Sequence, residues 1–424
     1  MALDRRDFLE RSGLALAAAA VLGPEALAAG DETEAEPLAP LAWPSVRSQF
    51  RLRRDRVHLG AFLLASHPTA VRRAIEDYRR ALDADPLDYL HREGPAREAA
   101  VLRAAASYTG GRAADIALTD STTMGLALLY NGLHVRPGQE LLTSTHDFFV
   151  THEALRLKAE RSGASLRHVR LYDRGARASV DDVVRRLTTA VTRRTRVVAL
   201  TWVHSSTGVK LPIRRIAAAL ATLNRGRAES ERILLCVDGV HGFGVENVRL
   251  PQLGCDFFVA GCHKWLFGPR GTGLVWGRPG AWRHVAHTIP SFTETGTPGS
   301  AMTPGGFHSF EHRWALAEAF RFHQRIGRRR VAARTHALTA QLKSGLAAMR
   351  HVTLHTPRAA SLSAGLVCFD VRGVPPQRVV DHLRVRGIVA TVTPYAESYA
   401  RVGPSILNTP AEVERTLRVL RALR

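Results

Sequence analysis

The chain has 424 residues, of which 45% are hydrophobic and 23% charged, so it is long enough for two folded domains and is neither disordered nor fibrous. Its formal net charge is +21, but no run of five or more Lys and Arg residues occurs, which excludes a basic tail and favours arginines scattered over helix faces. The four cysteines have neither metal-ligand spacing nor the pattern of a disulfide framework.

The first 30 residues have the features of an export signal. Arg5-Arg6-Asp7-Phe8-Leu9 precedes an apolar stretch at 13–22, and Ala26-Leu27-Ala28-Ala29 supplies a small-residue cleavage site. The apolar stretch is too short to span a bilayer, and its start resembles a twin-arginine signal. We therefore expect residues 1–30 to direct export to the periplasm or cell exterior and to leave no membrane segment; an uncleaved N-terminal helix is the alternative. Residues 31–58 are predicted to form a linker and N-terminal segment.

Residues 59–300 alternate between β-rich runs and helical patterns, the latter at 124–133, 148–161 and 213–223. Such alternation is typical of a mostly parallel sheet covered by helices on both faces. The last two β-rich runs have no helix between them, so we expect a hairpin near one edge. The prediction is an α/β fold whose large domain contains a seven-stranded sheet, with strands at 116–119, 140–143, 166–171, 195–203, 233–237, 257–260 and 273–276.

Residues 301–424 predict a second, smaller α+β domain. A long helical pattern covers 311–350 and carries apolar repeats. Two β-rich runs follow at 363–371 and 388–393, with helical patterns at 376–386 and 410–423. No internal repeat is present.

One lysine is the strongest functional signal in the chain. Only four of the 59 basic residues are lysine, and Lys264 lies in Ala260-Gly261-Cys262-His263-Lys264, directly before a glycine-rich turn. Upstream, Asp238 ends the predicted strand at 233–237. A lysine can form a Schiff base with a carbonyl, which a guanidinium cannot, and a carboxylate can keep a pyridine nitrogen protonated. Pyridoxal phosphate (PLP) needs both groups, so the pair predicts a PLP enzyme.

A phosphate site is predicted where the first strand of the large domain becomes a helix. Ser121-Thr122-Thr123 offers hydroxyls and free backbone N–H groups at this point, which suit an anion. Ordinary N-capping uses the same residue types and is the alternative. His263 is a candidate second phosphate contact, with a buried core histidine as the alternative.

Further candidates fall at predicted strand ends, where parallel α/β sheets bind ligands. His146 follows the strand at 140–143 and is the candidate for stacking on the cofactor ring, with His152 as a rival on the next helix. His241 and the turn that begins at Ser205 are candidates for hydrogen bonds to the phenolic oxygen; the alternative is that the segment is only a turn.

The motif Asp238-Gly239-Val240-His241, taken with the His263-Lys264 segment and its glycine-rich turn, resembles the class V aminotransferase family of fold type I PLP enzymes, especially isopenicillin N epimerase-like members. The resemblance extends from about residue 59 to 423. It implies pyridoxal 5'-phosphate as cofactor, an amino-acid-like small-molecule substrate and a homodimer. It also implies individual roles: Schiff-base formation by Lys264, pyridinium pairing by Asp238, ring stacking by His146, phosphate contacts from Thr122, Thr123 and His263, phenolic-oxygen contacts from His241 and Ser205, and a substrate-carboxylate contact from Arg401.

One expected feature of the desulfurases in this family is missing. They carry a nucleophilic cysteine shortly before the carboxylate-binding arginine, but no cysteine lies between Val371 and Arg401, and Cys368 lies in an apolar strand pattern. We therefore predict chemistry at the α-carbon of an amino acid or derived amine, by a transaminase or epimerase. The alternatives are a β-lyase without a persulfide cysteine, a non-catalytic PLP-fold binding protein, and a nucleic-acid-binding protein driven by charge.

Overall fold

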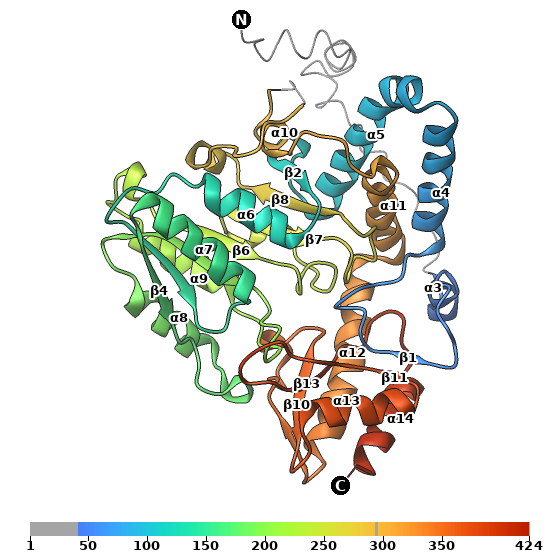
Figure 1. Ribbon diagram of the computed structural model, residues 1–424. Helices are drawn as coiled ribbons and strands as arrows, with labels where there is room; N and C mark the ends of the chain where they lie inside the picture. The colour runs from blue at the N-terminus through green and yellow to red at the C-terminus, as the bar shows by residue number, and fades with distance from the viewer. Residues whose placement is uncertain (1–40, 293–295, 424) are drawn as a thin grey trace, which may run out of the picture.

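The protein is described by a computed structural model that covers residues 41–292 and 296–423 (Figure 1). The expected export signal at 1–30 lies outside the described residues. The remaining chain forms a large unit around one sheet and a smaller unit, drawn in orange and red, that carries the C-terminus (Figure 1).

The central sheet has seven strands within the described residues, in the order β2-β8-β7-β6-β5-β3-β4. The pairs β3·β4, β3·β5, β5·β6 and β6·β7 are parallel, whereas β8 is antiparallel to both β7 and β2. This confirms the predicted mostly parallel α/β sheet and its hairpin near one edge. The strands are β2 Ile116–Thr119, β3 Glu140–Ser144, β4 Ser165–Val169, β5 Thr195–Thr201, β6 Leu234–Asp238, β7 Phe257–Gly261 and β8 Gly273–Gly277.

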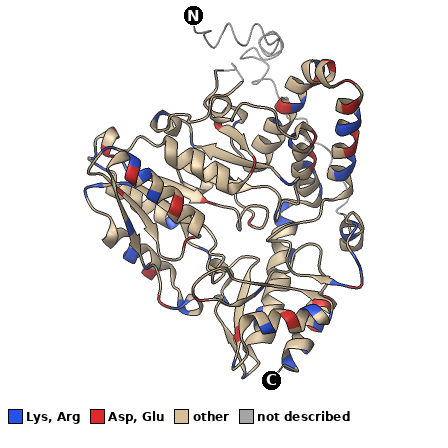
Figure 2. Cartoon of the chain, in the orientation of Figure 1, with Lys and Arg blue, Asp and Glu red and all other residues tan. Residues whose placement is uncertain are grey.

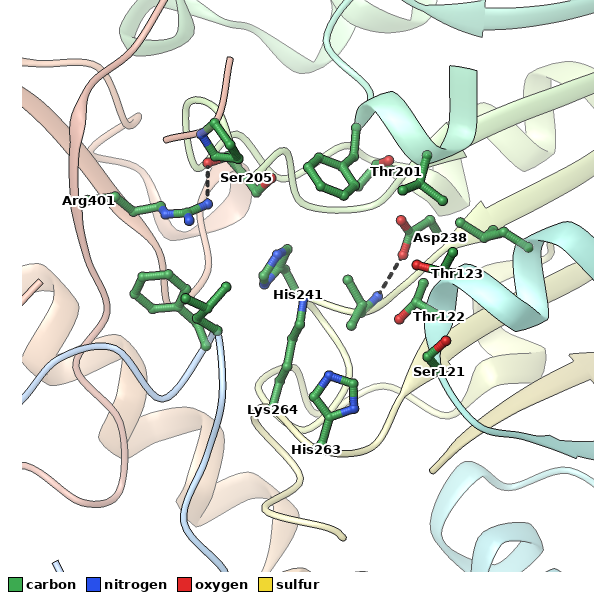
Figure 3. Close-up of a pocket in the computed structure, with 17 residues that line it drawn as sticks. Ser121, Thr122, Thr123, Thr201, Ser205, Asp238, His241, His263, Lys264 and Arg401 are labelled. Carbon is green, nitrogen blue, oxygen red and sulfur yellow. Dashed lines mark hydrogen bonds between the residues drawn. The ribbon is translucent and has the colours of Figure 1, made fainter. Parts of the chain in front are cut away.

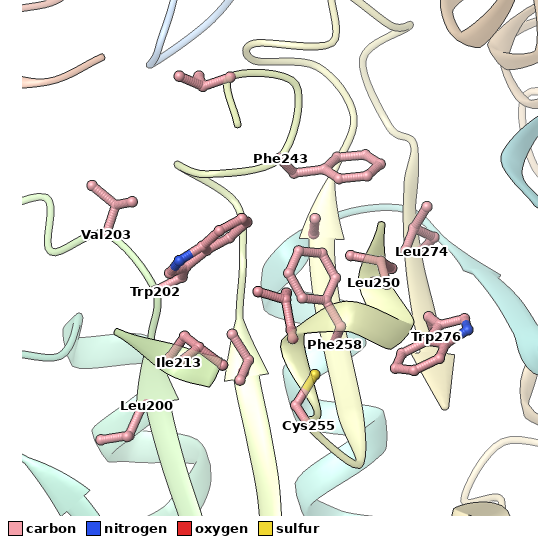
Figure 4. Packing of buried hydrophobic residues seen from close by; sticks show 14 of the residues in the cluster. Leu200, Trp202, Val203, Ile213, Phe243, Leu250, Cys255, Phe258, Leu274 and Trp276 are labelled. Carbon is pink, nitrogen blue, oxygen red and sulfur yellow. The ribbon is translucent and has the colours of Figure 1, made fainter. Parts of the chain in front are cut away.

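Alternate residues of the strands face two separate hydrophobic cores, one on each side of the sheet. On one side they pack against α6 (Thr122–Gly132) and α7 (Phe149–Ser162). On the other side the cover comes from α5 (Pro86–Thr109), α8 (Val180–Ala190), α9 (Ile213–Leu223) and α11 (Phe310–Ile326). Figure 4 shows part of this second core, including Trp202 and Phe258. Because every residue of β5, β6 and β7 is buried, most of their residues are apolar; the polar exceptions are Thr195, Arg196, Thr201 and Asp238.

The smaller unit is a four-stranded sheet in the order β12-β13-β10-β9 with helices packed against it. Its helix α12 (Arg328–Ala347) follows α11 after Gly327, whose φ of 91° ends the first helix. The helical pattern at 311–350 is therefore two helices. The other elements are β9 Val352–Leu354, β10 Val367–Val371, α13 Pro376–Val385, β11 Ile388–Val389, β12 Thr391–Val392, β13 Ala400–Val402 and α14 Pro410–Arg421.

Two sets of contacts cross the expected boundaries at 58 and 300. Strand β1 (Val57–His58) pairs with β11, so part of the expected linker belongs to the smaller unit. Helix α11 packs against α4 (Thr69–Ala84) and α5, and its Leu316 and Phe320 belong to the core of the large unit. Short helices α3 (Trp43–Ser48) and α10 (Pro298–Met302) complete the fold. The pairing of β1 with β11 and the packing of α11 against α4 and α5 join segments far apart in sequence, and local sequence patterns do not predict such contacts.

The positive charge is distributed over many elements. In Figure 2 basic segments occur on helices of both units and alternate with acidic segments on the long helix α4 and on α7. Many exposed arginines pair with a carboxylate one helical turn away, as Arg156 does with Glu153 and Glu160. Among the described residues, no helix is long and apolar enough to cross a membrane.

Candidate active site

A cavity of about 200 Å³ lies at the carboxyl ends of β5, β6 and β7 and the start of α6. It contains eight of the nine predicted site residues (Lys264, Asp238, His241, Thr122, Thr123, Ser205, His263 and Arg401). In Figure 3 the start of α6 and Arg401 lie on opposite sides of this cavity, with Lys264 and His241 between them. The site therefore has one end suited to an anion at a helix start and another end with a guanidinium.

Lys264 extends into the cavity from the loop that follows β7. The loop is closed by hydrogen bonds from Phe267 N to Lys264 O (3.0 Å) and from Gly268 N to Cys262 O (2.9 Å). Burial lowers the pKa of Lys264 from 10.5 to about 8; nearby Asp238 opposes this shift and Arg401 adds to it. Its amine has no hydrogen-bond acceptor among the described residues, so it is free to react.

Asp238 is the last residue of β6 and is only 3% exposed. One carboxylate oxygen accepts a hydrogen bond from Val240 N at 3.1 Å. Burial raises its pKa to about 6, and within the described chain it has no ion pair. An ionised carboxylate that is buried with one hydrogen bond and no ion pair is energetically unfavourable unless a ligand brings a positive charge next to it.

His241 is buried beside Asp238 and Lys264 in a neutral form. Burial, together with the nearby Lys264 and Arg401, lowers its pKa well below the usual value. Trp265 Nε1, which can only donate, makes a hydrogen bond of 3.5 Å to Nδ1 of His241. The remaining proton is therefore on Nε2, where it can be donated to an oxygen of a ligand.

The start of α6 is arranged for an anion. Ser121 Oγ caps the helix by accepting from Met124 N (3.1 Å), and Thr122 Oγ1 accepts from Gly261 N at the end of β7 (2.8 Å). Thr123 is exposed, and the buried Nδ1 of His263 has no partner among the described residues. Capping and anion binding are thus compatible here, because the cap uses only one of the three hydroxyls.

Arg401 reaches the cavity from β13 of the smaller unit. Its Nη1 donates to the main-chain oxygen of Ser205 (3.0 Å), its Nε donates to Thr391 Oγ1 (3.1 Å), and its guanidinium lies 4.8 Å from the ring centre of Phe62. Nη2 has no acceptor in the described chain, so it remains for a carboxylate oxygen. Ser205 Oγ is hydrogen-bonded to Tyr395 Oη at 2.6 Å.

The structure separates His146 from the other predicted residues. Its ring stacks on Tyr172, with ring centres 3.8 Å apart and planes 7° from parallel, and it lines a neighbouring cavity instead. Phe148, two positions later, lines the cavity of Lys264, as does Thr201, whose buried Oγ1 has no partner in the described chain. Sequence reasoning missed both residues: Phe148 follows the predicted strand at 140–143, whereas Thr201 was counted inside the strand predicted at 195–203, which ends at Thr201 in the structure.

The fold and the cavity together define a fold type I PLP enzyme. Residues 65–415 match the aminotransferase class-V family, and the chain belongs to that family. Among similar curated proteins, isopenicillin N epimerase of Streptomyces clavuligerus is 26% identical over 410 residues, covering 91% of this chain and 99% of that protein. A protein named as a probable cysteine desulfurase, from Pseudomonas aeruginosa, is 30% identical over 357 residues, covering 78% of this chain and 82% of that protein.

Solved structures show the same fold. A C-DES mutant with glycine covalently linked to its PLP cofactor has 21% sequence identity and a TM-score of 0.78, covering 89% of this chain and 99% of that chain. The apo cysteine desulfurase from Thermococcus onnurineus NA1 has 20% identity and a TM-score of 0.78, covering 91% and 99%. At these identities the likeness supports the architecture alone.

The cofactor of this family is pyridoxal phosphate, and the residues present fit it. Asp238 suits a protonated ring nitrogen, and His263 Nδ1 together with the start of α6 suits a phosphate. Buried polar atoms without partners are uncommon in folded proteins, so the unpaired atoms of His263 and Thr201 point to a polar ligand in this cavity.

Uptake of pyridoxal phosphate by the apo protein is expected to accelerate as pH rises through about 8. The neutral amine is the form that attacks an aldehyde, and the lowered pKa of Lys264 makes this form abundant from about pH 8 upward. Stopped-flow absorbance at a series of pH values measures the rate, with Lys264→Ala as the blank. An inflection above pH 10 would show that the amine keeps its ordinary pKa.

Proposed function

We propose that the protein acts at the α-carbon of an amino acid or an amino-acid-derived amine, as an epimerase or transaminase. The observation that carries this proposal is the placing of Lys264, Asp238 and Arg401 around one cavity. A proton acceptor, a carboxylate for the cofactor ring and a guanidinium for the substrate carboxylate are the groups that such a reaction needs.

Each residue has a distinct task in this proposal. The Arg401 guanidinium binds the substrate carboxylate and thereby orients the α-carbon. Lys264, which is neutral above about pH 8, removes the α-proton through its Nζ. Bound pyridoxal phosphate supplies an electron sink for the negative charge left on that carbon. Asp238 stays ionised beside a cationic ring nitrogen and keeps that nitrogen protonated.

The return of the proton decides the product. Return to the α-carbon from the other side gives the epimer; with pyridoxal phosphate bound, return of the proton elsewhere would lead instead to a keto acid. The similarity to isopenicillin N epimerase over 91% of the chain favours the first outcome. His241 carries its one proton on Nε2 within the same cavity, where this N–H can donate a hydrogen bond to an oxygen of the ligand.

Desulfuration is the second candidate, because a desulfurase-like protein is 30% identical. The cysteines argue against it: all four (Cys236, Cys255, Cys262 and Cys368) are buried. Cys368, the one in contact with Ser205, is 0% exposed, and burial raises its pKa to about 12. A thiol in this state is a poor nucleophile, so persulfide formation on the protein is disfavoured.

Hydrogen exchange in heavy water tests the proposal. The PLP-loaded protein is incubated with individual amino acids, and loss of the α-proton signal is followed by NMR, with Lys264→Ala as the control. We expect exchange with one or more compounds, together with either the opposite enantiomer or a keto acid. A coloured, loaded protein that exchanges no α-proton, or one that releases sulfide from cysteine without exchange, would overturn the proposal.

We further propose that the protein is exported and works as a homodimer. The twin-arginine pattern at Arg5-Arg6 supports export. Large apolar side chains that are more than half exposed, among them Leu63, Phe149 and Phe307, support a second copy of the chain as cover. Cell fractionation and light scattering of the purified protein test these two points separately.

A further inference from the structure

A second, larger cavity lies beside the cavity of Lys264, and we call it the distal cavity. Its volume is about 850 Å³, compared with about 200 Å³. Its walls come from the loops that follow β3, β4 and β5, from β9, and from the loop between β12 and β13. Because the loop after β5 contributes to both cavities and β3 and then β4 follow β5 in the sheet order, the two cavities lie side by side along one edge. Its size suits a small-molecule ligand, for which sites measure roughly 300–1,000 Å³.

A thin wall separates the two cavities. Ser205 lines the Lys264 cavity, whereas the next residue, Ser206, lines the distal cavity. Across the wall, Ser205 Oγ is hydrogen-bonded to Tyr395 Oη at 2.6 Å, and Tyr395 faces the distal cavity. Phe148, on the lysine side, has its ring centre 6.0 Å from that of Tyr395. The partition is therefore one layer of side chains thick.

The distal cavity carries an excess of positive charge. Arg170, Arg174 and Arg177 lie on its lining, and none of them has a carboxylate partner among the described residues. Of the two acidic residues there, Asp173 is occupied by Arg186 at 2.7 Å and Glu397 accepts a hydrogen bond from a tyrosine. Three unpaired guanidinium groups around a concave surface attract anions.

The wall also contains polar atoms without partners. Ser206 is 8% exposed, lines the distal cavity, and its Oγ has no hydrogen bond within the described chain. Nε2 of His146, also on the lining, is equally unpaired, and its ring is fixed by stacking on Tyr172. Buried polar atoms normally have partners, so these atoms are suited to a ligand that brings acceptors or donors.

We propose that the distal cavity binds an anionic group, a carboxylate or a phosphate, at the far end of a long substrate whose α-amino end lies at Lys264. The inference deepens the proposed function and depends on it, since it assigns the substrate class: amino acids with an extended side chain that ends in a negative charge. Arg174 and Arg177 bind the distal anion, and the Ser205–Tyr395 hydrogen bond opens to let the middle of the side chain cross the wall.

Matched lysine derivatives test the inference by binding as well as by turnover. Nε-succinyl-lysine and Nε-butyryl-lysine have the same length and differ in a terminal carboxylate, and Nε-(3-phosphonopropionyl)-lysine carries a phosphonate at that position. Titration calorimetry on the PLP-loaded protein should give roughly tenfold or tighter binding for an anionic derivative than for the butyryl one. Preference between succinyl and phosphonopropionyl distinguishes a carboxylate from a phosphate ligand.

The variant Arg174→Ala/Arg177→Ala should remove this preference and leave affinity for the butyryl derivative unchanged. The control Arg193→Ala/Arg225→Ala removes the same amount of positive charge from exposed positions outside the distal cavity. This control variant should keep the preference for the anionic derivatives. Two results would overturn the inference. One is equal affinity of the wild-type protein for all three derivatives; the other is an equal loss of the preference for anionic derivatives in both double variants. Absence of α-proton exchange with every derivative, with the affinity difference intact, would instead overturn the proposed function alone.

Discussion

Replacing Lys264 with alanine is expected to abolish the visible absorbance of the lysine-linked cofactor and to lower turnover by about a thousandfold or more. The reason is that no other described lysine lines the cavity, so neither the covalent link nor the proton acceptor has a substitute. An absorbance spectrum and the heavy-water exchange assay measure the two effects on the same sample.

Lys264→Arg separates the role of the amine from that of the charge. A guanidinium keeps the positive charge but does not lose a proton near neutral pH, so this variant should be as inactive as alanine. Lys158→Ala is the matched control, because Lys158 only donates a hydrogen bond to Asn131 O outside the cavity. Turnover retained by Lys264→Arg would show that the amine is not the reactive group.

Asp238→Asn is expected to lower kcat by roughly a hundredfold to a thousandfold while the apo protein becomes more stable. The amide cannot hold a proton on the ring nitrogen, so the electron sink weakens. The raised pKa of Asp238, from 3.8 to about 6, means that the folded state disfavours the ionised carboxylate. At pH 7 this costs about 3 kcal/mol, which the neutral amide avoids.

The raised pKa of Asp238 also predicts how the stability of the apo protein changes with pH. A carboxyl group whose pKa is raised on folding stabilises the protein fully below pH 3.8, and the stabilisation is lost as pH rises to about 6. Apo wild-type protein should therefore lose stability across this window relative to Asp238→Asn. Urea denaturation at several pH values measures the difference. A constant gap between the two proteins from pH 4 to 7 would contradict the raised pKa.

The sequence was informative wherever a pattern is local. The runs 197–200, 234–237 and 257–260 within β5, β6 and β7 are apolar because both faces of those strands are buried, which made the sheet predictable. Lys264 and Asp238 could be placed together because parallel strands bring their carboxyl ends to one edge. The helix break at Gly327 was not predictable from the apolar repeats, which continue on both sides of it.

The position of His146 shows where local reasoning ends. The buried Asp147 fixes the loop after β3, since its carboxylate accepts from Ser144 N at 2.8 Å and Thr143 Oγ1 at 2.9 Å. With Asp147 held in this way, His146 lines the distal cavity and Phe148 lines that of Lys264. The partner of His146, Tyr172, comes from a different loop, so the choice between the two rings depends on tertiary contacts.

The scarcity of lysine has a practical consequence for chemical labelling. Lys158, Lys210 and Lys343 each donate hydrogen bonds to oxygen acceptors, and Lys210 is also paired with Glu246, whereas Lys264 has no acceptor among the described residues. Burial lowers the pKa of both Lys264 and Lys343 to about 8, but the Lys343 amine donates hydrogen bonds to three oxygens, so Lys264 should be the first lysine that a small acylating reagent modifies near pH 8. A small acyl tag could then be installed at the reactive centre without mutagenesis, and intact-mass spectrometry would count the sites modified.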